Sequence, residues 1–129
     1  MNKKLLITGS VLGIISIVLG AFASHGLEKL ITEDAIETFQ VGVRYQMYHA
    51  LLLLFVGNSS KILTKSKQWI FVLTTIGVIL FSGSIYGLST NELSGFDFKT
   101  LGFITPLGGL FLISSWLIML LGFLNLKEE

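Results

Sequence analysis

Polar side chains able to bind a ligand recur inside stretches of this chain that are otherwise apolar. They comprise imidazoles, a guanidinium, phenols, an amide and small hydroxyls: His25, Arg44, Tyr45, Gln46, Tyr48, His49, Ser82, Ser84, Tyr86 and Thr105. The densest group runs from position 44 to position 49. Polar groups inside an apolar helix are costly and mark functional sites by default. The pattern therefore predicts a polar binding site, with these residues as its candidate ligand-binding set.

Helical spacing sorts the central group of polar residues into two faces. Residues three or four positions apart are neighbours on a helix surface. One face collects Gly42, Gln46, His49 and Leu53, and a neighbouring face carries Arg44 and Tyr48. At about 1.5 Å per residue, His49 lies roughly 12 Å along the helix from Val41. We expect a group at that depth to need a hydrogen-bond partner.

Two interpretations of these polar residues stay open from the sequence. In the structural one, Arg44 extends to the headgroup region, while His49 and Gln46 bond a neighbouring helix. In the functional one, the residues line an outward-opening pocket in which His25 and His49 are the working groups. Both fit the sequence, because intramembrane polar residues serve packing and function alike.

Specific chemistries are constrained by the residues that the chain contains. His25 and His49 could ligate a haem iron as a pair, which is the one cofactor alternative we keep. His49 with Tyr45 could form an acid–base pair, but no serine or cysteine nucleophile has an oriented base beside it. The chain has no Cys, and zinc hydrolysis needs three or more converging ligands. We therefore predict no enzyme, no metal site and no cofactor beyond the haem alternative.

The composition indicates that these residues sit in an integral membrane protein. Of 129 residues, 52% are hydrophobic and 13% are charged, and the mean hydropathy is +0.78. A soluble domain of this length carries about 25% charged residues. The net charge of +1 gives no field for binding nucleic acid. The length suits one domain, residues 1–129.

Four segments approach the roughly 20 mostly apolar residues that cross a bilayer as a helix. We place the spans at about 5–23, 41–57, 69–88 and 103–126. The first also resembles a signal peptide, but its apolar stretch is longer than the usual signal core. The predicted fold class is all-α: a four-helix transmembrane bundle made of two helical hairpins with short loops.

The second span is the least apolar, and its helix should begin before the span does. Thr32 is a suitable N-cap residue, and the acidic Glu33 and Asp34 suit a first helical turn. We predict one helix from about Glu33 to Gly57, interfacial at first and buried later. In the last span, Thr105 and Pro106 open the helix, since proline is tolerated in a first turn.

The distribution of basic residues predicts that both termini are cytoplasmic. Lysines gather on the cytoplasmic side of membrane proteins. The N-terminus, second loop and C-terminus hold Lys3, Lys4, Lys61, Lys65, Lys67 and Lys127, against Lys29, Arg44 and Lys99 on the other side. Small residues repeat along the spans, as in Gly9 and Gly13, and we expect these stripes to be helix-packing surfaces.

Four motifs along the chain resemble those of a known family. They are Gly20-Ala-Phe-Ala-Ser-His-Gly-Leu27, Arg44-Tyr-Gln-Met-Tyr-His-Ala-Leu51, Phe81-Ser-Gly-Ser-Ile-Tyr86 and Ile104-Thr-Pro-Leu-Gly-Gly109. In this order they resemble the small bacterial membrane proteins called domain of unknown function 423, the YgdD-like family. The chain differs at Ala23, Ser24 and Ser115, none of which alters a chemically active side chain. The resemblance implies a four-helix inner-membrane protein and implies no activity.

Two functions from different classes fit these observations. The first is a binding or accessory component that docks onto a larger membrane complex or binds a lipid headgroup at the outer leaflet. The second is a transporter or channel, which would require a homo-oligomer because a chain of this size has little room for a path. No acidic residue lies in any predicted span, which removes the usual proton or cation carrier. We therefore predict the binding or accessory role.

Overall fold

The protein is a row of long antiparallel helices. The computed structural model describes residues 1–93 and 102–128. Its helices are α1 (Asn2–His25), α2 (Glu33–Asn58), α3 (Thr64–Ser89) and α4 (Ile104–Leu124), with short 3-10 turns η1 (Leu27–Lys29) and η2 (Asn91–Leu93). No strand occurs in these two ranges. The all-helical class predicted from the sequence is confirmed.

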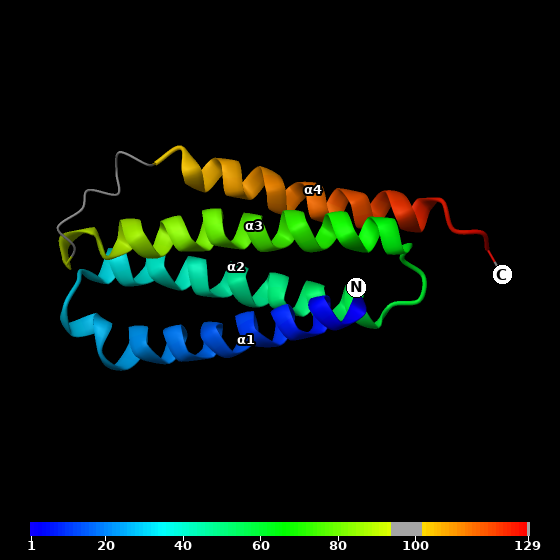
Figure 1. The fold of residues 1–129 in the computed structure, drawn as a ribbon. Coiled ribbons are helices and arrows are strands. Elements are labelled where there is room, and N and C mark those ends of the chain that lie inside the picture. The colour runs from blue at the N-terminus through cyan, green and yellow to red at the C-terminus, as the bar shows by residue number, and fades with distance from the viewer. Residues whose placement is uncertain (94–101, 129) are drawn as a thin grey trace.

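Helices that are neighbours in the sequence are also neighbours in space (Figure 1). α2 and α3 form the central pair, with α1 packed on α2 and α4 packed on α3. Both chain termini lie at one end, which we call the terminal end (Figure 1). The α1–α2 connection lies at the opposite end, which we call the hairpin end. The arrangement is the pair of hairpins expected from the sequence, joined through α2 and α3.

Helix starts follow the local sequence. The side-chain oxygen of Thr32 accepts a hydrogen bond of 3.1 Å from the backbone N–H of Ala35, so the predicted N-cap of α2 is confirmed. Pro106 is the third residue of α4. A first-turn N–H has no partner within the helix, so proline costs α4 no hydrogen bond there.

Glycines allow close contact between adjacent helices. A Cβ atom at Gly9 would lie 2.8 Å from the carbonyl oxygen of Ala50. At Gly108 it would overlap the backbone N of Phe81 and lie 2.9 Å from the carbonyl carbon of Leu80. Small residues let membrane helices approach in this way. The packing role predicted for the small-residue stripes is confirmed at Gly9. A Cβ at Gly13 would make only an ordinary contact at 3.9 Å, and one at Gly83 or Gly122 would meet nothing within 4 Å.

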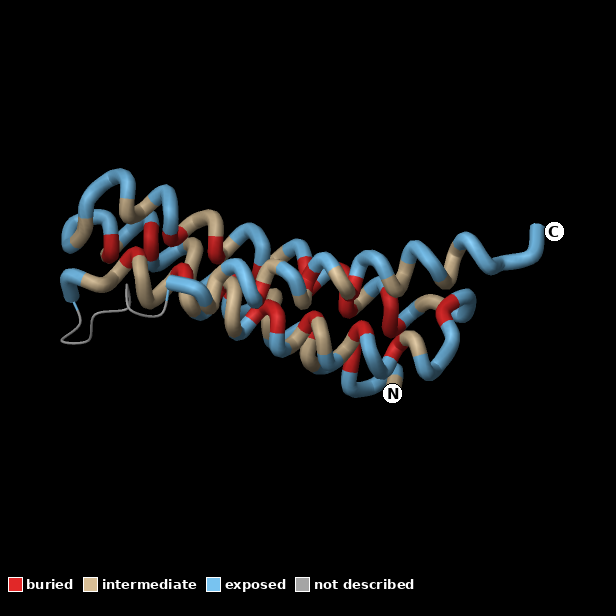
Figure 2. Tube along the Cα trace, turned by 90° about the horizontal axis from the view of Figure 1, so that it is seen from above, coloured by how far each residue is buried: buried red, intermediate tan, exposed pale blue. Residues whose placement is uncertain are grey.

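Buried residues form an apolar cluster at each end of the row, and polar contacts lie between the clusters. The terminal-end cluster combines Leu5, Leu52, Leu53, Val56, Ile62 and Ile70, and the hairpin-end cluster combines Ala23, Leu27 and Phe39. Exposed residues recur along every helix, alternating with intermediate and buried ones (Figure 2). Many exposed side chains are large and apolar, such as Ile14, Ile79 and Leu110. An apolar exterior around a small core is the surface expected of a protein in lipid.

Three stretches are long and apolar enough to cross a membrane: residues 2–29, α3 and α4. α2 is not among them, although it is as long as α3. Its first turns carry the acidic residues Glu33, Asp34 and Glu37, and Arg44 follows. The charges predicted for the third loop include Asp97 and Lys99, which lie outside the described residues.

Candidate functional site

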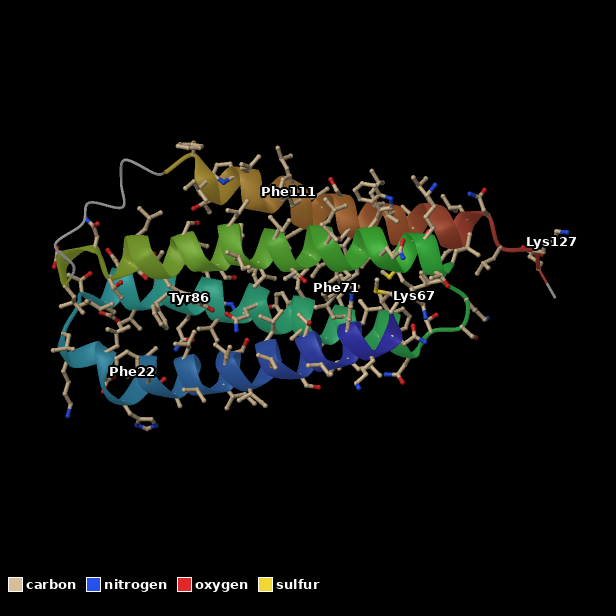
Figure 3. The ribbon with its side chains drawn as sticks, in the orientation of Figure 1. Phe22, Lys67, Phe71, Tyr86, Phe111 and Lys127 are labelled. Carbon is tan, nitrogen blue, oxygen red and sulfur yellow. The ribbon has the colours of Figure 1, made fainter. Side chains whose placement is uncertain are left out.

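A chain of hydrogen bonds centred on Gln46 joins three helices. The side-chain N–H of Gln46 donates to the carbonyl oxygen of Leu12 in α1 at 2.9 Å. The hydroxyl of Tyr86 in α3 donates to the amide oxygen of Gln46 at 2.6 Å. In Figure 3 the Tyr86 side chain extends from α3 toward α2. Only 3% of Gln46 is exposed, and its amide uses both its nitrogen and its oxygen to hold α1, α2 and α3 together.

The absence of a side chain at Gly42 makes room for the Tyr86 ring. A Cβ atom there would lie 2.7 Å from Cε1 of Tyr86. Ser82 donates to the carbonyl oxygen of Gly42 at 2.8 Å, one turn before Tyr86. The ring of Phe39 packs against the ring of Tyr86, with ring centroids 4.9 Å apart. Tyr86 is therefore fixed in the position from which its hydroxyl reaches Gln46.

His49 links α2 to α4 and uses both of its ring nitrogens. Its Nδ1 lies 2.7 Å from the backbone carbonyl oxygen of Tyr45, which can only accept, so Nδ1 carries the proton. Its Nε2 then accepts the indole N–H of Trp116 at 3.0 Å. Only 4% of His49 is exposed. The structural interpretation of His49 and Gln46, as groups that bond neighbouring helices, agrees with these contacts.

Hydroxyl groups join α3 to α4. Thr74 donates to Ser115 at 2.8 Å, and Ser115 donates to the carbonyl oxygen of Phe111 at 3.3 Å. Nearer the hairpin end, the hydroxyls of Ser84 and Thr105 are hydrogen-bonded to each other. These pairs lie at an interface brought close by Gly77 and Gly108. They act as interhelical bonds between α3 and α4.

Four predicted site residues have side chains outside this network: His25 on α1, and three on the exposed side of α2. Arg44, Tyr45 and Tyr48 are exposed, with 40% of Tyr45 and 50% of Tyr48 accessible. The Tyr45 ring contacts the rings of Tyr48 and Phe81 at 5.4 and 5.1 Å between centroids. No described residue forms a hydrogen bond or ion pair with the guanidinium of Arg44 or with either hydroxyl.

The part of α2 that carries Arg44 borders an open depression of about 690 Å³. Its lining comes from the first half of α2: Asp34, Ile36, Glu37, Thr38, Gln40, Val41 and Arg44. Ligand pockets range from about 300 to 1,000 Å³. The depression lies toward the hairpin end of the molecule and combines one cation with two carboxylates.

The two histidines are not brought together. His25 is exposed at the end of α1, whereas His49 lies beyond Gln46, whose partner is Leu12. Leu12 precedes His25 by thirteen residues, which is about 20 Å along a helix. Tyr45 offers His49 its backbone carbonyl rather than its hydroxyl. Neither the haem pair nor the acid–base pair has the geometry that it would need.

Sequence reasoning did not assign bonding roles to several polar residues that the structure shows in the network. Trp116 and Thr74 each bond a side chain of another helix. At the terminal end, the sequence predicts Lys67 in the second loop, but it lies in the first turn of α3 and is 5% exposed. Its Nζ donates to the side-chain oxygen of Asn2 in α1 at 2.8 Å. Lys67 is labelled in Figure 3. Polar residues within the spans were the available signal.

Comparison with known proteins identifies a family without an assigned activity. The model of DUF423, a protein family of unknown function, matches residues 19–109. A UPF0382 membrane protein of Staphylococcus haemolyticus is 35% identical over 92% of this chain and 93% of its own length. YwdK of Bacillus subtilis, also a UPF0382 membrane protein, is 38% identical over 91% and 93%.

A third relative extends the similarity to a Gram-negative bacterium. The UPF0382 inner membrane protein YgdD of Escherichia coli is 32% identical over 99% of this chain and 95% of its own length. No solved structure matches the chain. The matched segment, residues 19–109, includes the open face of α2.

Proposed function

The chain belongs to the DUF423 family of membrane proteins, and we propose that it is a binding or accessory component of the bacterial cytoplasmic membrane whose recognition surface is the open face of α2. We define this face by its exposed residues: Glu37, Arg44, Tyr48, Leu51 and Phe55, with Tyr45 at its edge. The ligand or partner would bind from within the bilayer. A relative that is named an inner membrane protein supports this location.

Four membrane crossings with both termini in the cytoplasm are part of the proposal. α2 has 26 residues, as α3 does, and it packs between α1 and α3, which shield its Gln46 from lipid. An even number of crossings is consistent with termini at one end (Figure 1). Lys3, Lys4 and Lys61 are exposed at that end, which favours the cytoplasm by the positive-inside rule.

The observation that carries the proposal is the contrast between bonded and unbonded polar groups on α2. Gln46 and His49 are buried and hydrogen-bonded: Gln46 to α1 and α3, and His49 to Trp116 of α4 and to the carbonyl oxygen of Tyr45 within α2. Arg44 and the Tyr48 hydroxyl have none among the described residues. An arginine facing lipid near the middle of a helix costs about 2.5–3.5 kcal/mol on insertion scales, and less when it extends toward an interface. A bound polar group would remove that cost.

The contrast between bonded and unbonded polar groups divides the predicted ligand-binding residues into two groups. We propose that Arg44, Tyr45 and Tyr48 contact the ligand and that Gln46, His49, Ser82, Ser84, Tyr86 and Thr105 hold the helices that support them. His25 shares the hairpin end with the depression but lies on α1. A rigid α2 between two partner helices would keep the three contact residues in fixed positions, which reduces the entropy lost on binding.

Native mass spectrometry of the gently extracted protein tests this proposal. We expect a defined extra mass on the wild-type chain, lost in Arg44→Gln and retained in Lys29→Gln. Lys29 is an exposed cation at the same end of the molecule, in η1, so it controls for general charge effects. A bare wild-type chain would overturn the proposal. A bare homo-oligomer would favour transport by an assembly of identical chains instead.

A further inference from the structure

We infer that the open face of α2 binds a phospholipid whose headgroup carries a phosphate and a primary ammonium group. The inference rests on the proposed function, because it names the ligand of that same face. It follows from the order of charges along α2 and from the apolar strip that continues beyond them. The chemistry corresponds to an aminophospholipid such as phosphatidylethanolamine.

Opposite charges line the same depression at different depths. Asp34 and Glu37 lie at the start of α2, toward the hairpin end, and Arg44 lies two turns farther along. The Cα atoms of Glu37 and Arg44 are separated by about 10 Å along the axis. Helical side chains lean toward the helix N-terminus, so Arg44 extends toward the acidic residues. No described carboxylate lies within ion-pair distance of the guanidinium, so no described residue neutralises the charge that Arg44 presents.

This order matches the order of groups in a phospholipid. The phosphate is attached to glycerol and lies nearer the acyl chains, while the ammonium group lies farther out, toward water. A phosphate beside Arg44 would receive bidentate hydrogen bonds from the planar guanidinium. The ammonium group would then reach toward Glu37 and Asp34. The match depends only on the hairpin end lying at a membrane surface, whichever leaflet that surface belongs to.

The part of the open face that follows Arg44 toward the terminal end suits an acyl chain. Tyr48, Leu51 and Phe55 follow Arg44 at intervals of four, three and four residues and so continue the same side of the helix. Their exposed fractions are 50, 55 and 54%. Tyr48 follows Arg44 by one helical turn, so its exposed phenol can hydrogen-bond the glycerol esters of a lipid whose phosphate lies beside Arg44. One lipid molecule can therefore satisfy the polar and the apolar parts of this face together.

The carboxylates decide which headgroup is preferred. A headgroup without a cation, as in phosphatidylglycerol, would place uncompensated negative charge beside Glu37 and Asp34. Phosphatidylcholine has a cation but no N–H to donate. Only the primary ammonium supplies both charge and hydrogen bonds, and charge-assisted hydrogen bonds are the stronger kind. We expect a preference of about tenfold for phosphatidylethanolamine over phosphatidylglycerol, the ratio given by one such bond.

The experiment titrates the full-length delipidated protein, in detergent, with three lipids of identical acyl chains. Native mass spectrometry counts bound phosphatidylethanolamine, phosphatidylcholine and phosphatidylglycerol. Glu37→Gln should reduce the preference for phosphatidylethanolamine about tenfold and leave phosphatidylglycerol bound at least as well as before. Arg44→Gln should weaken all three lipids, because each has a phosphate. Glu28→Gln, an exposed carboxylate in η1 at the same end, is the matched control and should change nothing.

The outcomes separate this inference from the proposed function. Selectivity that depends on Glu37 supports the inference. Equal binding of the three lipids, lost in Arg44→Gln, overturns the headgroup assignment and leaves the α2 face as a recognition surface. Binding unchanged in both variants overturns the two proposals together. An extra mass on the extracted protein that proves to be a protein subunit overturns the lipid inference alone. Melting profiles of these surface variants should match the wild type, which excludes unfolding as the cause.

Discussion

Replacing Gly108 by alanine should destabilise the protein far more than the same change at the adjacent Gly109. A Cβ at position 108 would overlap the backbone of Phe81 and lie 2.9 Å from the carbonyl carbon of Leu80. At position 109 the Cβ would lie 3.7 Å from a ring carbon of Phe81, an ordinary contact. Backbone atoms cannot rotate away as a side chain can, so α4 has to move off α3. The two changes share the same helix and the same intrinsic propensity gain, which cancels in the comparison.

The size of the effect follows from what the displacement would break. Moving α4 outward by about 0.5–1 Å lengthens the bonds that cross this interface, Thr74 to Ser115 and Ser84 to Thr105. Interhelical hydrogen bonds in membranes contribute about 0.6 kcal/mol on average and at most about 1.7. Overpacking a core adds about 1–3 kcal/mol. We therefore expect Gly108→Ala to cost about 2–3 kcal/mol more than Gly109→Ala, or about 30- to 150-fold in the unfolding equilibrium.

Reversible unfolding in mixed micelles, followed by tryptophan fluorescence, measures this difference. Trp116 lies on α4 and bonds His49 of α2, so its emission reports on the position of α4. Gly109→Ala should unfold at or above the wild-type midpoint. Equal stability of the two variants would refute the close α3–α4 approach, and with it the packing argument for the hydroxyl pairs.

Three further predictions concern the polar network and the topology. Tyr86→Phe removes the donor to Gln46 and should lower the free energy of unfolding by about 0.6–1.7 kcal/mol in the same assay; no loss would mean that this bond contributes nothing. Nitrogen-15 NMR of labelled His49 should show the proton on Nδ1, and Trp116→Phe should shift the Nε2 resonance by removing its donor; an Nε2-protonated ring in the wild type would contradict the network. The chain has no native Cys, so a single introduced cysteine can report on topology. Leu30→Cys at the hairpin end should react with an impermeant reagent added outside intact spheroplasts, whereas a cysteine in the α2–α3 loop should not. The reverse pattern would mean that the orientation is inverted.

Local patterns predicted the elements and their faces well. The start of α2 at Glu33 and its N-cap at Thr32 follow from side-chain chemistry that acts within one turn. The buried face of α2 also followed from spacing, since Gln46 and His49 are buried while Arg44 is exposed. These features depend on residues close together in the chain, where helical geometry alone fixes the relation.

The partners of the buried residues could not be predicted in the same way. Gln46 donates to a backbone carbonyl of α1, and every residue has such a carbonyl, so no side-chain type marks Leu12 as the acceptor. The His49–Trp116 bond depends on how α4 lies against α3 and reaches α2. The expected convergence of His25 with His49 fails for a related reason. Placing two residues on one side of a membrane does not fix their separation along antiparallel helices.

The hydrogen bond from Gln46 to Leu12 has a consequence for how the chain enters the membrane during synthesis. In the proposed four-crossing topology, α2 is the least favourable helix for insertion, and it leaves the ribosome after α1 but before α3. Its buried amide can find its first partner in the helix that has already emerged, without waiting for Tyr86. α1 and α2 can therefore pass from the translocon into lipid as one hairpin, with α1 serving as an intramolecular chaperone for the helix that follows it.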